Sequence, residues 1–255
     1  MPALIFDCDG VLADTERYGH LPAFNQTFRE FNVPVQWSEE EYGVKLKIAG
    51  GKERMASLLT PEFVKRANLP GDPEAQKEML ARWHKRKTAI YKQMNLDGVL
   101  PGRPGVARVV REAIAAGWQL AVASTSAEES VRAVLESVVG KDTAAHFEVL
   151  AGDIVPKKKP APDIYLLTLE RLKVLPEKAL IVEDSRNGLL AAAAAGVRCV
   201  VTLSSYTWEE DMRAALLVVS DLGEPGAPMK VIANRSAARP GDYITLPDLA
   251  ACLDS

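Results

Sequence analysis

Features that mark secreted, membrane-spanning or nucleic-acid-binding proteins are scarce in this sequence of 255 residues. Its three cysteines are odd in number and lack metal-ligand spacing, so we expect a reducing compartment and no disulfide framework. No apolar run approaches the length of a membrane span, and no secretory signal opens the sequence as given. The formal net charge of −3 gives no electrostatic reason to expect a nucleic acid or a membrane as partner. The sequence therefore predicts a soluble intracellular protein with a small-molecule ligand.

Histidine is equally scarce, and the glycines form no nucleotide-binding fingerprint. The three histidines, His20, His84 and His146, are dispersed along the chain, and we interpret them as structural or surface residues. Candidate catalytic residues are therefore sought among the acids, hydroxyls and lysines.

Apolar strand-like runs alternate with helical patterns, which predicts an α/β fold with a doubly wound parallel sheet. We expect the strands near residues 3–6, 119–123, 147–150, 179–182, 198–202 and 217–219. Residues 15–96 contain only helix-like segments broken by proline and glycine, and we interpret them as an inserted α-helical cap. The core would then comprise residues 1–14 and 97–255. Within it, we expect a surface excursion over 224–242 and a short strand and final helix in 243–255.

Asp7 and Asp9 are the most informative pair of residues, because both follow a predicted strand directly and precede Gly10. One carboxylate at such a strand end can attack phosphorus and the other can transfer a proton. Acids that simply close a strand and turn give the same local pattern. Further candidates along the chain favour the catalytic reading.

Two candidate sites further along the chain carry groups that can hold a phosphate. Ser124, Thr125 and Ser126 end one strand just before a helix, where hydroxyls and backbone N–H groups can hold anionic oxygens. Lys159 precedes Pro160-Ala161-Pro162, and the prolines would stiffen the chain and aim the ammonium. Helix caps and a solvated lysine run are the ordinary alternatives.

Glu183 and Asp184 follow another predicted strand at once. Carboxylates at the same end of parallel strands can share a hard cation such as Mg²⁺, which prefers oxygen ligands. Open α/β sheets bind their ligands at this carboxyl edge. The ordered set of four sites therefore predicts phosphoryl-transfer chemistry.

The motifs Asp7-x-Asp9-Gly, Ser124-Thr125, Lys159-Pro-x-Pro and Glu183-Asp184 resemble the four ordered motifs of the haloacid dehalogenase superfamily. Within that superfamily, Trp37-Ser38 and the tract 50–55 resemble the CbbY-like branch of sugar-bisphosphate phosphatases. The resemblance implies a Rossmann-like core with a helical cap. It also implies a metal-dependent phosphoric monoester hydrolase.

The resemblance implies a role for each motif residue. Asp7 would be the nucleophile that forms an aspartyl-phosphate, Asp9 the general acid and base, and Ser124 and Lys159 the groups that hold the phosphoryl oxygens. Mg²⁺ would be bound by Asp7, the Asp9 carbonyl and Asp184, with Glu183 acting directly or through a water. Substrate contacts in the core would add Thr125 and Ser126.

In the cap, the unreacted phosphate of a bisphosphate needs its own anion site. Flexible glycines leading into a helix with two cations in its first turn offer one, namely Gly50, Gly51, Lys52 and Arg54. Glu16 and Tyr42 are candidates for the sugar hydroxyls. Solvent-facing charge on an amphipathic helix is the ordinary alternative.

The branch implies xylulose 1,5-bisphosphate as substrate, and an indirect link to Rubisco because this compound inhibits the carbon-fixing carboxylase. A β-phosphoglucomutase-type mutase is the closest alternative, because it has similar core motifs. A dehalogenase is a weaker alternative, because Asp9 supplies a proton donor that halide departure does not need. A catalytically silent phosphate-binding scaffold is also weaker, since every motif is intact. We expect a monomer in the bacterial cytoplasm, or in the chloroplast stroma if a transit peptide has been removed.

Overall fold

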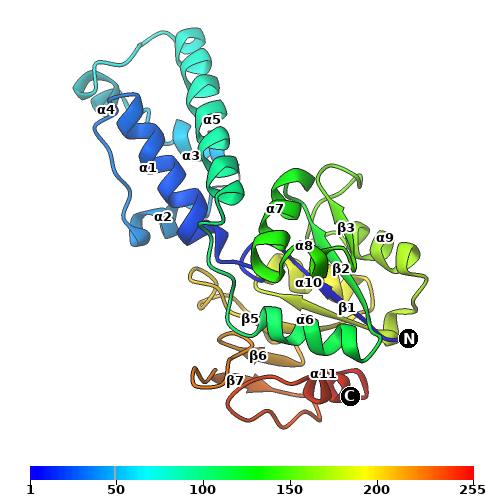
Figure 1. The fold of residues 1–255 in the computed structure, drawn as a ribbon. Helices are drawn as coiled ribbons and strands as arrows, with labels where there is room; N and C mark the ends of the chain where they lie inside the picture. The colour runs from blue at the N-terminus through cyan, green and yellow to red at the C-terminus, as the bar shows by residue number, and fades with distance from the viewer. Residues whose placement is uncertain (49) are drawn as a thin grey trace. The chain divides into compact units, whose positions relative to one another are not determined.

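The computed structural model describes residues 1–48 and 50–255. The chain forms two compact units, one of Met1–Thr15 with Gly98–Ser255 and one of Glu16–Asp97. The first unit contains the sheet, and the regular elements among the described residues of the second unit are all helices (Figure 1). None of the helices in the described part of the chain is long and apolar enough to cross a membrane.

A seven-stranded sheet forms the centre of the first unit, with the order β3-β2-β1-β4-β5-β6-β7. All neighbouring pairs are parallel except β6 and β7. The strands are β1 (Ala3–Phe6), β2 (Gln119–Ser124), β3 (Phe147–Ala151), β4 (Ala179–Glu183), β5 (Arg198–Thr202), β6 (Leu217–Val219) and β7 (Val231–Asn234). The predicted parallel α/β fold is confirmed, and the six predicted strands form β1 to β6.

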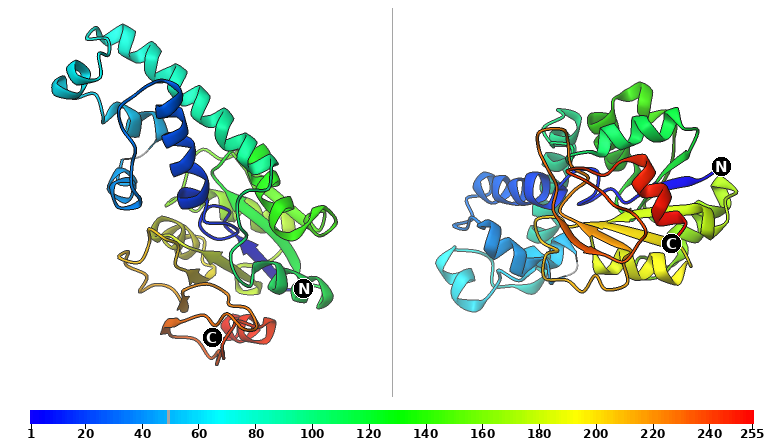
Figure 2. Two further views of the ribbon diagram at one scale, coloured as in Figure 1. Left: turned by 60° about the vertical axis from the view of Figure 1, so that its left-hand side comes forward. Right: turned by 90° about the horizontal axis from the view of Figure 1, so that it is seen from below.

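Helices cover both faces of this sheet, as the view from below shows (Figure 2). On one face lie α6 (Val106–Ala115), α7 (Glu128–Val139) and α11 (Leu246–Leu253); on the other lie α9 (Asp163–Leu172) and α10 (Arg186–Ala194). The short helices α8 (Lys141–Ala144) and η2 (Pro176–Lys178) complete the unit. Since both faces are covered, the central strands are largely apolar, and every residue of β1 is buried.

Two details of the C-terminal region differ from the prediction. The strand β7 lies within the expected surface excursion, and its Val231 and Ile232 are nearly half exposed. The expected short strand in residues 243–255 is absent, although the final helix α11 is present there. The prediction missed β7 because it is a solvated edge strand that lacks the buried apolar run of the central strands.

The second unit contains the π-helical turn η1 (Glu16–His20) and the helices α1 (Leu21–Glu30), α2 (Glu39–Lys45), α3 (Gly51–Ala56), α4 (Pro61–Arg66) and α5 (Pro73–Leu96). Helices α1 and α5 pack against each other. Aromatic rings fill the interior: Phe28 lies edge-on to Trp37 at 4.9 Å and to Trp83 at 6.3 Å between ring centroids. This unit therefore has an apolar core of its own.

Candidate active site

The register of the sheet brings three predicted motifs to one edge. Phe6 of β1 pairs with Val122 of β2 and with Val182 of β4, so these strands end at the same level. The residues that follow, including Asp7, Ser124 and Glu183, therefore gather at the carboxyl edge of the sheet.

Lys159 joins two of these motifs directly. Its ammonium donates hydrogen bonds to Asp7 Oδ1 at 2.6 Å, to Glu183 Oε1 at 2.6 Å and to the Ala123 carbonyl at 3.1 Å. Burial lowers the pKa of Lys159, but the two carboxylates outweigh burial and raise it above its usual value. The ammonium therefore stays charged beside Asp7 across the physiological range.

The carboxylates of Asp7, Glu183 and Asp184 crowd together, with ligand oxygens within 4.8 Å of one another, and all three residues are buried. Burial raises the pKa of Asp7 to about 7, with Lys159 acting in the opposite direction. Burial, and then the neighbouring carboxylates of Glu183 and Asp7, raise the pKa of Asp184 well above its ordinary value. Such crowding of like charges is relieved by a divalent cation.

The chain leaves room for these acids. Gly10 has φ +82°, and a Cβ there would lie 2.0 Å from Asp184 Oδ2. A larger residue at this position would displace the Asp184 carboxylate. The donor set of hard carboxylate oxygens and the space reserved for Asp184 both fit an oxygen-liganded cation such as Mg²⁺.

Asp9 is held by two hydroxyl groups, one on each carboxylate oxygen. Thr15 donates to Oδ1 at 2.6 Å and Ser126 donates to Oδ2 at 2.5 Å. Ser124 is buried beside this pair and accepts a hydrogen bond from the Ser126 backbone N–H at 3.1 Å. Thr125 lies next to them, partly exposed. The contact from Thr15 could not be predicted from the sequence. The Thr15 hydroxyl, six positions from Asp9, reaches the Asp9 carboxylate only because of the shape of the intervening loop.

Tyr165 is a further residue that the sequence did not single out. Its hydroxyl donates to Glu183 Oε1 at 2.5 Å, and the ring centroid lies 4.8 Å from the Lys159 ammonium. Burial, and then the Glu183 charge, raise the pKa of Tyr165 well above its usual value, so the phenol remains protonated. In sequence it reads as an apolar position of α9, which explains why it was missed.

Arg103 forms hydrogen bonds with three loops at the same edge of the sheet. Its guanidinium donates to the carbonyls of Gly10 at 2.5 Å, Leu203 at 2.7 Å and Ser220 at 2.5 Å, which follow β1, β5 and β6. These contacts fix the backbone around the acidic cluster. Only the folded arrangement of the loops identifies this role.

Within the second unit, three predicted substrate residues lie together. The Tyr42 hydroxyl donates to Glu16 Oε2 at 2.5 Å, and Arg54 donates to the Tyr42 oxygen at 3.1 Å. Arg54 also forms an ion pair with Glu16 at 3.6 Å. We call Glu16, Tyr42 and Arg54 the cap triad. Its members fix one another, so the Arg54 guanidinium has a defined orientation.

Other predicted cap residues lie at the start of α3. Gly50 has φ +90°, Gly51 opens the helix, and Lys52 is exposed. A Cβ on Gly51 would lie 3.2 Å from the Nε2 atom of His84. Lys87, which is buried, lies 2.7 Å from the Nδ1 atom of His20. The second unit thus gathers several cationic and imidazole groups that the sequence left unassigned.

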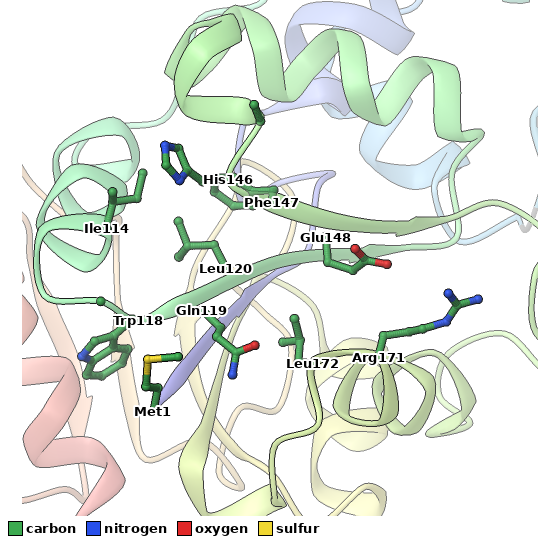
Figure 3. A pocket seen from close by; sticks show the side chains of 12 residues that line it. Met1, Ile114, Trp118, Gln119, Leu120, His146, Phe147, Glu148, Arg171 and Leu172 are labelled. Carbon is green, nitrogen blue, oxygen red and sulfur yellow. The ribbon is translucent and has the colours of Figure 1, made fainter.

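A separate pocket lies at the opposite end of the strands (Figure 3). Gln119 and Phe147, the first residues of β2 and β3, line it together with Trp118, His146 and Arg171. None of the predicted catalytic residues lines this pocket. The acidic cluster at the carboxyl edge is therefore the better candidate for the active site.

Comparisons with known proteins identify the family of this chain. A family model described as haloacid dehalogenase-like hydrolase matches residues 1–196. The chain is 46% identical to a CBBY-like protein from Arabidopsis thaliana, over 88% of this chain and 70% of that protein. It is 40% identical to protein CbbY from Cupriavidus necator, over 96% of this chain and 95% of that protein. A crystal structure of a CbbY variant from Rhodobacter sphaeroides in complex with xylulose 1,5-bisphosphate is similar, with a TM-score of 0.70 and 39% identity over 89% of this chain and 97% of that chain.

Proposed function

The chain belongs to the haloacid dehalogenase-like hydrolases, and on that basis we propose that this phosphatase hydrolyses a sugar bisphosphate with Mg²⁺ as its cofactor. The observation that carries the chemistry is the Lys159 ammonium, which bridges Asp7 and Glu183 beside Asp184. The proposed substrate is xylulose 1,5-bisphosphate, supported by the complex that the similar CbbY variant forms with this compound. The products would be xylulose 5-phosphate and inorganic phosphate.

The proposed ligands of the cation are Asp7, Asp184 and the backbone carbonyl of Asp9. Glu183 would act directly or through a water, and both of its oxygens already accept hydrogen bonds from the protein. When bound, Mg²⁺ would offset the charge of the carboxylates and of the substrate phosphate. Asp7 could then approach a phosphate dianion without prohibitive repulsion.

The proposed reaction has two displacements at phosphorus. Asp7 attacks the phosphoryl group and forms an aspartyl-phosphate while the bond to the sugar oxygen breaks. Asp9 donates its proton to the departing sugar oxygen, then accepts a proton from the water that hydrolyses the aspartyl-phosphate. Ser124, Lys159 and the backbone after β2 would hold the phosphoryl oxygens as charge builds on them.

The second, uncleaved phosphate is the proposed ligand of Arg54, Lys52 and the backbone N–H groups at Gly50 and Gly51. The cap triad supports this assignment for Arg54, because a guanidinium that is already oriented loses little freedom on binding an anion. Glu16 and Tyr42 would contact the sugar hydroxyls. A phosphatase of this kind would remove an inhibitor of the carbon-fixing carboxylase.

The test is phosphate release from xylulose 1,5-bisphosphate by protein stripped with a chelator and then supplied with Mg²⁺. We expect no release after stripping and full recovery on addition of Mg²⁺. β-Glucose 1-phosphate with its 1,6-bisphosphate serves as the comparison substrate. Formation of glucose 6-phosphate without net phosphate release would contradict the proposal and identify a mutase.

A further inference from the structure

The Glu183 carboxylate lies in a closed cage of hydrogen-bond donors. It is 1% exposed. Lys159 and the Tyr165 hydroxyl donate to Oε1, at 2.6 Å and 2.5 Å. The backbone N–H of Asp184, at 3.0 Å, donates to Oε2. A Cβ on Gly188 would lie 1.8 Å from the carboxyl group, so helix α10 is also shaped around it. The carboxylate therefore has one defined position.

Lys159, in contrast, has no spare N–H group in this state. Its three N–H groups match the three acceptors that lie within hydrogen-bonding distance, on Asp7, Glu183 and Ala123. A phosphoryl oxygen that binds to Lys159 must replace one of these three acceptors. Losing the Glu183 contact would leave a buried carboxylate oxygen without a donor, unless another donor is already in place.

Tyr165 is that donor. Its ring is completely buried, its hydroxyl reaches the same oxygen of Glu183 that Lys159 uses, and its ring face lies against the ammonium. The phenol stays protonated, so its hydroxyl can go on donating a hydrogen bond to Glu183 while Lys159 turns. The hydrogen bond of the Tyr165 hydroxyl goes to Glu183 and not to Asp7, the reacting carboxylate.

We propose that Tyr165 is a positioning residue for phosphoryl transfer. Its hydroxyl stabilises the Glu183 carboxylate while Lys159 redirects one hydrogen bond from Glu183 to the phosphoryl group. This inference rests on the role of Lys159 proposed above. It assigns the phenolic hydroxyl to the chemical step and not to the binding of substrate. The hydroxyl should therefore affect kcat, with little effect on KM.

Tyr165→Phe tests this, because it removes one oxygen and keeps the ring. Tyr243→Phe is the matched control, since its ring packs over Arg108, away from the acidic cluster. We would measure phosphate release from p-nitrophenyl phosphate and the sugar bisphosphate, and inhibition by orthovanadate, which mimics a phosphoryl group in transfer. We expect kcat of Tyr165→Phe to fall about tenfold, with KM within about twofold and vanadate inhibition weakened by a similar factor.

The inference is wrong if Tyr165→Phe keeps the parental kcat and vanadate inhibition, or if KM alone rises. It is also wrong if the loss of kcat only mirrors a loss of folded protein, which thermal unfolding of both variants measures. Failure of the proposed function gives a different pattern. A parent protein active on p-nitrophenyl phosphate but inactive on the sugar bisphosphate would remove the proposed substrate and leave the role of Tyr165 testable.

Discussion

The Lys159 ammonium lies 2.6 Å from a carboxylate oxygen of Asp7, although the two residues are 152 positions apart in the sequence. The contact is almost shielded from solvent, since only about a tenth of each side chain is exposed. A cation and a nucleophile that are paired before substrate binds need little rearrangement during the reaction.

Lys159→Met should lower kcat by at least about 100-fold, because the variant loses the charge that stabilises the phosphoryl oxygens and the partner of Asp7. Steady-state phosphate release measures the effect. Lys158→Met is the matched control, because the side chain of the neighbouring Lys158 is 58% exposed and forms an ion pair with Asp153 on the surface. Equal losses in the two variants would mean that the lysine run acts through general charge.

Ser126→Ala should lower kcat about tenfold with KM within about twofold, because Asp9 loses one of the two hydroxyl groups that hold it. Ser126→Thr keeps a hydroxyl and should recover most of the activity. The sequence predicts instead that Ser126 binds substrate. A rise in KM at constant kcat would favour that assignment over the positioning of Asp9.

Arg54→Ala should raise KM for a sugar bisphosphate at least about tenfold and hardly change KM for p-nitrophenyl phosphate. The reason is that only the bisphosphate presents a second phosphate to the guanidinium of the cap triad. Lys65→Ala, a change of an exposed lysine on α4, is the control. Equal effects of Arg54→Ala on both substrates would exclude a role in binding the second phosphate.

Acidification should destabilise the protein through His20. Burial, and then the neighbouring Lys87 charge, hold the pKa of His20 well below its usual value of 6.5 in the folded state. The unfolded chain therefore binds a proton below pH 6.5 that folded His20 does not, so stability present above pH 6.5 is lost as pH falls toward the folded pKa. The loss is at most about 1.4 kcal/mol per pH unit.

Denaturant titrations between pH 7 and pH 5 measure this loss. His20→Gln keeps an acceptor for Lys87 and should show a shallower fall in unfolding free energy than the parent. His146→Gln replaces an exposed histidine and should retain the parental slope. If His20→Gln matches the parent over the whole range, the low pKa of His20 is not responsible.

The sequence predicted the parallel sheet well, because most of the six strands are buried along nearly their whole length and read as apolar runs. It missed β7, whose Val231 and Ile232 are at a solvated edge between proline- and glycine-containing segments. The convergence of Asp7 and Glu183 could be predicted because the ends of neighbouring parallel strands meet.

Contacts that depend on side-chain direction could not be predicted in this way. Tyr165 occupies an apolar position of α9, and only the packing of that helix on the sheet aims its hydroxyl at Glu183. Thr15 reaches Asp9 through a tight loop, and Arg103 reaches carbonyls of loops about 100 positions away. These residues carry no motif, because their roles come from tertiary geometry.

The proposed substrate can be tested directly by comparing xylulose 1,5-bisphosphate with ribulose 1,5-bisphosphate. These compounds differ at one carbon, and a site that hydrogen-bonds a hydroxyl group can reject the wrong configuration strongly. We would measure Mg²⁺-dependent phosphate release from both, with Asp7→Asn as the inactive control. We expect kcat/KM to be at least about 100-fold higher for the xylulose compound, and we expect no turnover by Asp7→Asn. Equal rates on the two bisphosphates, or parental rates in Asp7→Asn, would contradict the proposal.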